Sequence, residues 1–523
     1  MTDTTTWCTA RVAATVDELG RLAADGPRLG TRHVVSAPFT GEPVAEIGLA
    51  DEGDVRSAFA AARTAQQTWA RLDHRTRARP FIALHDALFR RQREILDLIQ
   101  VETGKARAHA FEELLDAAAI TLYYARRAGR FLAPRRRLGA IPFFTRAREV
   151  RLPRGTVAVI TPWNYPLALG LADVVPALLA GNAVVHKPDT QTTLSTRWAW
   201  RVLVQAGLPA DVWQVLPGDP AEMGEALIAH ADSVCFTGST TAGRAVGRIA
   251  ADQPVPCTLE LGGKNAMVVL PDADVPAAVR GLLRAAFTSA GQLCMATERV
   301  LVAAPLMDRF LPELVSQVRQ LRVGAGFDFD VDMGSLTTPR QLARVIDHVE
   351  DARSRGATVL TGGRARPDLG PLFYEPTVLT GVVSGMKLHR EETFGPVLSV
   401  RSFRTEQEAI DLVNDTDYGL TTSIWSRDVR SARRLAGELR TGLVNINEGY
   451  AAAYGSHDAP AGGIKGSGVG VRHGRDGLLA FTRPQTVASQ HVMTFDRPAR
   501  LTAEHHARLL TAVFRTLKAT RVR

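Results

Sequence analysis

Residues 156–187 decide the fold, and they read TVAVITPWNYPLALGLADVVPALLAGNAVVHK. An apolar run at Thr156–Ile160 and a second one at Ala183–His186 are separated by a helical pattern from Ala168 to Ala180. Short apolar strands joined by a helix are typical of parallel βαβ units. We therefore expect a doubly wound sheet that binds its ligands at the carboxyl ends of the strands.

The same alternation continues along the chain. Further strands are expected at Val212–Leu216 and Ser233–Thr237. A second α/β series follows, with strands at 267–270, 299–302, 397–400 and 421–425. A chain of 523 residues is too long for one hydrophobic core, so we expect two or three domains and an active site in the cleft between the two series.

The segments before residue 156 have helical and turn patterns. Helices are expected at 51–72, 78–103 and 112–131, with Gly104 ending the second. Glu102–Lys105 is not a phosphate-binding loop, because the upstream Gly and the Ser or Thr after Lys are missing. Alternation at 141–144 and 147–150 predicts a hairpin. Residues 1–37 form an arm without evident chemistry.

Composition excludes several classes of protein. No run of about eighteen apolar residues occurs, and the N-terminus has no secretory signal, so we expect a cytoplasmic protein. The four cysteines are far apart, which argues against disulfides and against a structural metal site. The net charge of +9 comes from scattered Arg residues rather than one basic stripe, which disfavours nucleic-acid binding. The run Arg135–Arg137 is equally well interpreted as solvated surface.

One cysteine stands in a distinctive stretch, Ser289–Ala296, which reads SAGQLCMA. It lies between a helical pattern ending near Phe287 and the strand that begins near Arg299. Most free cysteines are buried and inert. A thiol on a Gly-containing turn between a helix and a strand can instead meet a ligand, which makes Cys294 a candidate nucleophile.

Four blocks occur in the order found in the aldehyde dehydrogenase superfamily, which the chain resembles from about Thr40 to about Val487. They are Thr161–Pro166, Leu259–Asn265, Gly291–Cys294 and Glu391–Pro396. The resemblance implies an α/β fold of two doubly wound parallel-sheet domains with a β-ribbon for oligomerisation, in a homodimer or homotetramer.

The implied domain boundaries follow from the same resemblance. The cofactor-binding domain takes 38–133 and 151–262, with 446–478 returning to it, and the catalytic domain takes 263–445. The ribbon takes 134–150 and 479–492, and a basic tail takes 493–523.

The resemblance also implies a reaction. Cys294 attacks the aldehyde carbonyl, Asn164 and the Cys294 N–H stabilise the oxyanion, and hydride transfer to the nicotinamide leaves a thioester. Glu260 activates the water that hydrolyses this thioester, which favours a free acid over transfer to coenzyme A. A binding protein that kept the fold is disfavoured, because all three residues are present together with Glu392.

The cofactor residues are also implied by the family. The turn after Ser233–Thr237 places small residues at the start of a helix, where free N–H groups can bind a pyrophosphate. Where the family often has Glu to bond the 2′-hydroxyl of NAD, this chain has Thr190, so we expect NADP, with NAD also possible. The implied cofactor-binding residues are Trp163, Lys187, Thr190, Gly238, Ser239, Gly243, Glu392 and Phe394.

The subfamily resemblance is to actinobacterial succinate-semialdehyde dehydrogenases. The two Arg residues that hold the distal carboxylate in better-studied members are replaced by Ala172 and Thr288, and the family's Phe at the tunnel by Ala461. We expect Tyr454, Ser456 and His457 to line the substrate tunnel. The alternative is a broad-specificity, long-chain or aromatic aldehyde dehydrogenase with a membrane-associated tail.

The tail itself has apolar residues on one helical face and basic residues elsewhere. Such a helix can lie on an anionic membrane, but docking of the stripe on the rest of the chain is the favoured interpretation.

Overall fold

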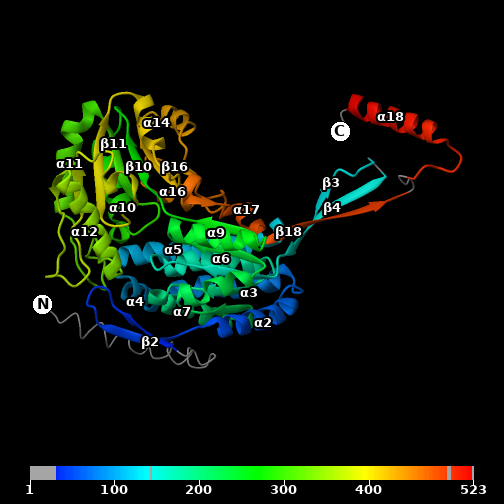
Figure 1. Ribbon diagram of the computed structural model, residues 1–523, viewed down its shortest axis with the longest axis horizontal. Coiled ribbons are helices and arrows are strands. Elements are labelled where there is room, and N and C mark those ends of the chain that lie inside the picture. Colours follow the sequence, from blue (N-terminus) through cyan, green and yellow to red (C-terminus); the bar gives the residue numbers. More distant parts are fainter. Residues whose placement is uncertain (1–30, 142–143, 492–495, 521–523) are drawn as a thin grey trace.

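The computed structural model describes residues 31–141, 144–491 and 496–520. Two large sheets, a three-stranded ribbon and a two-stranded hairpin make up its strands (Figure 1). Most of the expected N-terminal arm, including Cys8, lies outside the described residues. The described part of the arm begins with β1 (Thr31–Ser36), which pairs antiparallel with β2 (Pro43–Leu49).

The first large sheet has the strand order β17-β9-β8-β5-β6-β7 and is parallel except at β17. Its strands are β5 (Thr156–Ile160), β6 (Ala183–Lys187), β7 (Trp213–Val215), β8 (Ser233–Thr237), β9 (Cys257–Glu260) and β17 (Gly468–Val469). Its helices are α6 (Pro166–Leu179), α7 (Thr193–Gln205), α8 (Pro220–Ala229) and α9 (Thr240–Asp252). The strand order reverses at β5, between β6 and β8, which is where doubly wound sheets open a crevice for ligands.

The second large sheet has the order β12-β13-β14-β11-β10-β15-β16 and is parallel except at β12. Its strands are β10 (Asn265–Val269), β11 (Thr297–Ala303), β12 (Thr358–Thr361), β13 (Thr377–Thr380), β14 (Val397–Phe403), β15 (Thr421–Trp425) and β16 (Leu443–Ile446). Its helices are α10 (Val275–Phe287), α11 (Met307–Arg319), α12 (Pro339–Ser354), α14 (Glu406–Asn414) and α15 (Val429–Ala436). The two sheets confirm the doubly wound α/β fold.

The helices before β5 differ from the expectation at one point. They are α2 (Glu52–Trp69), α3 (His74–Arg90), α4 (Gln92–Thr103) and α5 (Arg107–Leu132). The single helix expected at 78–103 is wrong, because the chain leaves helical geometry at Arg91 (φ −105°, ψ 25°). The Arg91 guanidinium pairs with Glu94 inside the next helix, and α3 and α4 each bury apolar residues, among them Phe81 and Ile95. Gly104 ends α4 in the left-handed conformation, as expected.

The ribbon has the order β18-β4-β3, formed by β3 (Arg135–Arg137), β4 (Thr145–Pro153) and β18 (Thr482–Gln490). The hairpin expected between 141–144 and 147–150 is wrong. The partner of β4 within the hairpin is β3, and the chain turns back before Thr145. On the other side β18 pairs with β4 from Thr482–Pro153 to Gln490–Thr145. All of β3 and nearly all of β18 are exposed.

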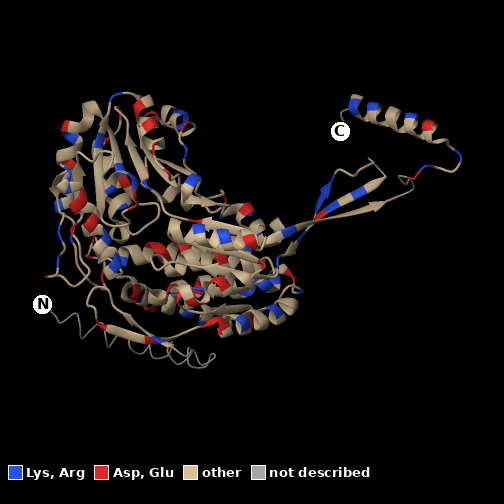
Figure 2. Ribbon diagram, viewed as in Figure 1, with Lys and Arg blue, Asp and Glu red and all other residues tan. Residues whose placement is uncertain are grey.

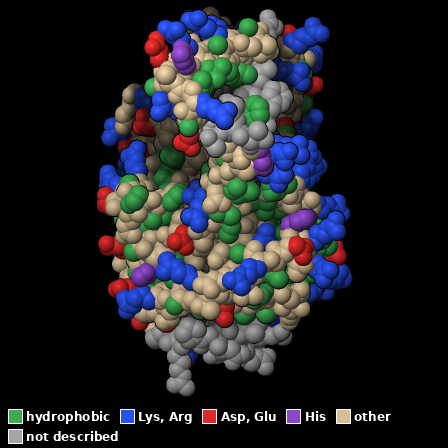
Figure 3. Space-filling model, turned by 90° about the vertical axis from the view of Figure 1, so that its right-hand side faces the viewer, with side chains coloured by type: hydrophobic (Ala, Val, Ile, Leu, Met, Phe, Trp, Pro, Cys, Tyr) green, Lys and Arg blue, Asp and Glu red, His purple; other side chains and the backbone are tan. Residues whose placement is uncertain are grey.

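The chain beyond the ribbon ends in α18 (Ala503–Ala519), which stands apart from the two large sheets (Figure 1). The expectation that its apolar stripe docks on the rest of the chain is wrong, because no residue of α18 is buried and Leu509 is 49% exposed. Basic side chains crowd this end of the molecule (Figures 2 and 3). No helix in the described ranges is long and apolar enough to span a membrane.

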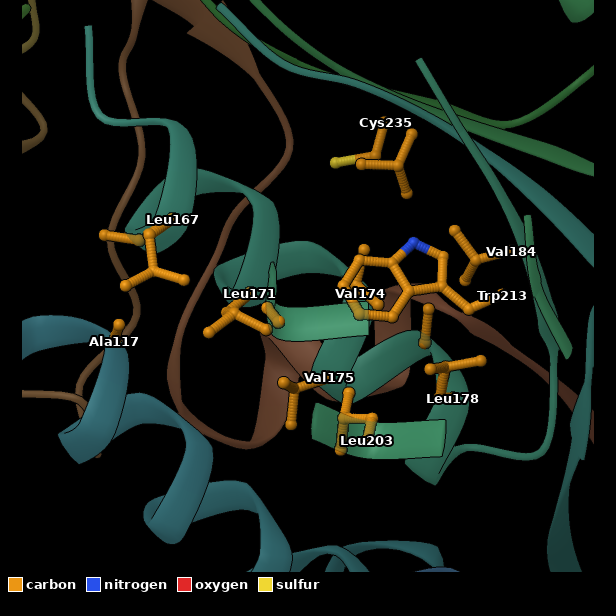
Figure 4. Packing of buried hydrophobic residues seen from close by; sticks show 14 of the residues in the cluster. Ala117, Leu167, Leu171, Val174, Val175, Leu178, Val184, Leu203, Trp213 and Cys235 are labelled. Atoms are coloured by element: carbon orange, nitrogen blue, oxygen red, sulfur yellow. The ribbon is translucent and has the colours of Figure 1, made fainter. Parts of the chain in front are cut away.

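The first sheet is held by a continuous core. Leu171, Val174 and Val175 of α6 pack with Trp213 of β7 and Cys235 of β8 (Figure 4). Every residue of α6 is buried, so both ends of this helix are fixed against neighbouring elements. The rigidity matters because the turn before α6 carries Asn164.

Candidate active site

Cys294 lies on a strained turn between α10 and β11. Ser289 and Ala290 adopt left-handed backbone conformations, with φ of 53° and 54°. A Cβ on Gly291 would come within 2.1 Å of the Gly395 carbonyl oxygen, so only glycine fits where the turn meets the loop before β14. Strain of this kind persists only where the surroundings enforce it, and here it accompanies a partly buried cysteine that lines a cavity.

Asn164 lies on the turn between β5 and α6 and is buried. One N–H of its side-chain amide donates to the Gln292 carbonyl oxygen at 2.9 Å, two residues before Cys294. The amide has a second N–H, which leaves a donor for a ligand. The side-chain oxygen has no hydrogen-bond partner in the described chain. The amide is thus tied to the nucleophile's turn by one of its two donors.

Glu260 ends β9 and is 8% exposed. Its carboxyl lacks a partner at Oε1 among the described residues. Burial raises the pKa of Glu260 to about 7, although the positive charge of Arg472 lowers it. A carboxyl with this pKa can accept and return a proton near neutral pH.

The thiol of Cys294 has a pKa raised to about 12, first by burial and then by the negative charges of Glu260 and Glu392. It is therefore protonated at rest. A nucleophilic sulfur at this position needs a nearby acceptor for its proton, and the carboxylate of Glu260 can be that acceptor.

A cavity of about 310 Å³ joins Cys294 and Asn164. Its lining also includes Tyr454 and His457, which the sequence predicted. The prediction is wrong for Ser456. Its exposed hydroxyl donates to the Ala452 carbonyl oxygen, and the residue does not line the cavity. Ala461 is buried among the apolar residues around Cys294 but is not a lining residue either.

Sequence reasoning missed several residues that line this cavity. Arg284, from α10, reaches Glu112 at 3.2 Å and Glu448 at 3.5 Å and lies 5.3 Å above the Tyr450 ring. Arg284 is the one Lys or Arg among the described lining residues. The sequence feature that could have pointed to Arg284 is its position on α10, ten residues before Cys294. On another part of the wall, His457 pairs with Asp116 at 2.8 Å.

The two positions where better-studied relatives carry Arg do not line this cavity. Ala172 borders a small separate space beside Asp173 and Arg472. Thr288 is buried at the start of the strained turn. Neither position supplies a positive charge to the wall beside Cys294.

The turn after β8 fits a dinucleotide phosphate. Ser239 caps α9 by accepting from the Ala242 N–H, as expected. A Cβ on Gly243 would come within 2.2 Å of Leu261, so glycine allows α9 to lie close to β9. Gly238 follows β8 directly and α9 begins at Thr240, so the first N–H groups of this helix lie at the carboxyl end of β8.

Lys187 is the last residue of β6, the neighbour of β5 in the sheet, and Thr190 lies three residues further on. Lys187 is 5% exposed, and among the described residues its Nζ donates only to the Pro188 oxygen, at 3.4 Å. Burial lowers the pKa of Lys187. A buried ammonium with so poor a partner fits a hydroxyl-bearing ligand such as a ribose.

Glu392 and Phe394 close the crevice from the second sheet. Glu392 Oε1 accepts from the Gly263 N–H at 2.7 Å, and burial raises the pKa of Glu392 to about 7. Phe394 has a left-handed backbone (φ 56°) and meets Trp163 edge to face, with 5.6 Å between the ring centroids. Trp163 after β5 and Phe394 before β14 are thus in contact, so these two expected cofactor residues meet between the two sheets. In the described chain, no group of His, Cys, Asp or Glu could hold a metal ion.

Comparisons with known proteins agree with this arrangement. The model of the aldehyde dehydrogenase family matches residues 27–487. A protein of Mycolicibacterium smegmatis, provisionally named succinate-semialdehyde dehydrogenase [NADP(+)], is 43% identical over 92% of this chain and 93% of its own length.

Solved structures have the same fold. A crystal structure described as an E. coli NADP-dependent enzyme is 32% identical, with a TM-score of 0.85, over 88% of this chain and 95% of that one. Betaine aldehyde dehydrogenase from Staphylococcus aureus, in complex with NAD+, is 30% identical, with a TM-score of 0.86, over 94% of this chain and 99% of that one.

Proposed function

The chain belongs to the aldehyde dehydrogenase family, and we propose that it oxidises an aldehyde to a carboxylic acid through a covalent bond to Cys294. The observation that carries the proposal is the meeting of Cys294 and Asn164 on one cavity, with a carboxyl of suitable pKa at Glu260 acting on the same thiol. These residues come from elements far apart in the sequence. Aligning a nucleophile, a donor and a base in this way is what acyl chemistry requires.

The first step is attack on the carbonyl carbon. Glu260 accepts the thiol proton as the sulfur bonds to the aldehyde, since a thiol with a pKa of about 12 keeps its proton at neutral pH without an acceptor. The carbonyl oxygen then carries a negative charge. The free N–H of Asn164 stabilises this charge together with the Cys294 N–H, and such a donor is worth about 10²- to 10³-fold in rate.

A bound nicotinamide dinucleotide supplies the hydride acceptor that turns the tetrahedral adduct into a thioester. Glu260 releases the thiol proton to solvent before hydrolysis, so that its carboxylate can take a proton from water as the water attacks the thioester. It then passes that proton to the departing sulfur. The thiol is regenerated and the free acid leaves.

We propose NADP as the preferred dinucleotide, with NAD also accepted. Lys187 and Thr190 would hold its ribose end, while Gly238, Ser239 and the N-terminus of α9 would hold the pyrophosphate. Glu392, Phe394 and Trp163 would hold the nicotinamide end. Thr190 has no charge that would repel a 2′-phosphate, and the M. smegmatis relative is named for NADP.

We propose succinate semialdehyde as the aldehyde. The relative's name supports it, and Arg284 offers a positive charge on the cavity wall for the distal carboxylate, with His457 and Tyr454 as further polar contacts. The alternative is a long-chain or aromatic aldehyde, which the apolar lining by Leu169, Leu293 and Met295 would accommodate.

We further propose a cytoplasmic homodimer or homotetramer that uses the ribbon for association, because β3 and β18 expose side chains that an adjoining subunit would cover. The domain boundaries given above belong to the same proposal.

The test compares initial rates of NADPH and NADH formation with succinate semialdehyde and with butanal, an uncharged aldehyde of equal chain length. We expect kcat/KM for the semialdehyde to exceed that for butanal by at least tenfold. The variant Arg284→Gln should lose most of that preference through KM. Equal or better rates with butanal would contradict the substrate and favour the alternative, and an absence of turnover with either aldehyde would contradict the activity.

A further inference from the structure

Lys105 lies directly behind the turn that carries Asn164. Its Nζ donates to the Asn164 backbone carbonyl oxygen at 2.7 Å and to Glu113 Oε2 at 2.5 Å, and it lies 3.7 Å from the centroid of the Tyr165 ring. Lys105 is 2% exposed and Glu113 is 1% exposed. A buried cation bonded to one chosen carbonyl fixes that peptide in place.

Glu113 extends the same arrangement to the start of α6. Its other oxygen, Oε1, accepts from the Leu167 N–H at 2.8 Å and from the Ala168 N–H at 3.3 Å. These are free N–H groups of the first turn of α6, which otherwise lack partners. The peptide of Asn164 and the helix that follows it are therefore held by one ion pair.

The nucleophile's turn is held from the same helix. His109 Nδ1 of α5 accepts from the Ser289 N–H at 3.1 Å, and burial lowers the pKa of His109 to about 4, so the ring is neutral and can accept. His109 and Glu113 are four residues apart and lie on one face of α5. That face supports both the turn of Asn164 and the turn of Cys294.

The residues before Lys105 fix its own position. Gly104 has φ of 74°, and a Cβ there would come within 2.1 Å of the Ser335 hydroxyl oxygen. The Thr103 carbonyl oxygen accepts from the Thr337 hydroxyl at 2.7 Å, and the Thr337 N–H donates to Gln292 Oε1 at 2.9 Å. Gln292 is also the residue whose carbonyl oxygen accepts from the Asn164 amide. Lys105 bonds the Asn164 backbone, and Gln292, which accepts from the Asn164 amide, is linked through Thr337 to Thr103. Both contacts of Asn164 therefore connect to the end of α4.

We propose that Lys105 and Glu113 are positioning residues that hold the Asn164 side chain at the place where the oxyanion forms. The inference rests on the proposed function and goes beyond it, because it assigns a role to a buried ion pair that does not react. Glu102–Lys105, which lacks the features of a phosphate loop, thereby has a role in the geometry of catalysis.

Removing the positive charge tests the proposal. Lys105→Met should lower kcat for aldehyde oxidation by about 10- to 100-fold, because a displacement of about 1 Å at a reacting centre can cost 10²-fold. The KM for NADP should change less than about threefold. Alkylation of Cys294 by iodoacetamide forms no oxyanion, so its rate should stay within about twofold of the wild-type rate, whereas a general disturbance of the site would change both rates.

A double-mutant cycle asks whether Lys105 acts through Asn164. Asn164→Ala alone should cost about 10²- to 10³-fold in kcat. Adding Lys105→Met to Asn164→Ala should then cost less than about twofold more, since the group being positioned is gone. Independent, multiplicative losses would overturn the proposal.

A double variant and a control variant separate an effect on the Asn164 amide from the general cost of removing a buried charge. Lys105→Met/Glu113→Gln removes the ion pair as a whole, which avoids an unpaired buried carboxylate, and it should show the same loss of kcat. Arg77→Met removes another buried cation that bonds a backbone carbonyl, that of Ala70, and should leave kcat unchanged. Failure of both Lys105 variants to fold would overturn the proposal, because the pair would then serve the fold rather than the amide. Inactivity of the wild-type enzyme would instead contradict the proposed function.

Discussion

Cys235 on strand β8 and Cys294 on the turn before β11 are two free thiols in very different surroundings. Both have a pKa raised by burial, that of Cys235 well above its ordinary value and that of Cys294 to about 12. Cys235 is 1% exposed in the core of the first sheet, packed with Trp213 and the apolar residues of α6 (Figure 4). Cys294 borders a cavity and is partly exposed.

The direction of the pKa shift therefore does not distinguish the two thiols. The difference lies in access and in the carboxyl group nearby. Asp173, which acts on Cys235, is occupied by the buried guanidinium of Arg472. Glu260, which acts on Cys294, has a free oxygen in the described chain and a pKa of about 7. The proposed role of Cys294 as nucleophile therefore rests on the cavity beside it and on a carboxyl that can take its proton, neither of which the described residues give to Cys235.

The largest expected effect is the difference in turnover between variants that replace each of the two thiols. Cys294→Ala should lower turnover by about 10⁴-fold or more, since no other group can form the covalent adduct. Cys235→Ala should keep kcat within about twofold while losing about 1 kcal/mol of stability, because it only deletes a small buried group. Steady-state rates and thermal unfolding of both variants provide the check. Turnover above a tenth of wild type in Cys294→Ala would refute the assignment.

The next effect concerns the base. Glu260→Gln keeps the size of the side chain but cannot accept a proton, so kcat should fall by about 10²- to 10⁴-fold. The rate of Cys294 alkylation at pH 7 should fall as well, because the thiol loses its acceptor. Cys235 in the same protein is the internal control, and its very slow alkylation should not change. Unaltered alkylation of Cys294 would show that Glu260 acts only on the hydrolytic water.

The comparison of the thiols also shows what could be inferred from the sequence. The turn before β11 made Cys294 a candidate nucleophile, which stays a prediction, and the alternation of apolar strands with helices correctly predicted both large sheets. The strands β9, β12, β13 and β16 were missed, because each is a four-residue segment that includes polar residues rather than a continuous apolar run.

The supporting groups could not have been found in this way. Lys105 and Asn164 are 59 residues apart, and His109 and Ser289 are 180 apart. No local pattern encodes such pairs, since each depends on how α4 and α5 pack against the two sheets. For the same reason Ser456 was placed in the cavity wall although its hydroxyl donates to the Ala452 carbonyl oxygen, and Arg284 was overlooked although it lines the cavity.

A smaller effect is the pH dependence of the wild-type reaction. Because burial raises the pKa of Glu260 to about 7, the carboxyl is protonated below that pH and cannot accept the thiol proton. The value of kcat/KM should fall about tenfold per pH unit below pH 7 and level off above it. A profile measured from pH 5 to 9 checks this. In Glu260→Gln the inflection near pH 7 should disappear, and an unchanged inflection would assign it to another group, such as Glu392 with its similar pKa.

The smallest effect appears in stability rather than in rate. The pKa of Glu260 is raised in the folded state from an ordinary 4.5 to about 7, so the folded protein holds this proton more tightly than the unfolded chain. As pH rises from 4.5 to 7 the unfolded chain ionises first, and folding loses up to about 3 kcal/mol, a loss that stays constant at higher pH. Glu260→Gln removes the titration and should gain about 2 kcal/mol in unfolding free energy relative to wild type between pH 5 and pH 8. Denaturant unfolding at the two pH values measures it. Cys235→Ala should show the same stability change at both, because a thiol whose pKa lies well above 9 does not titrate in that range.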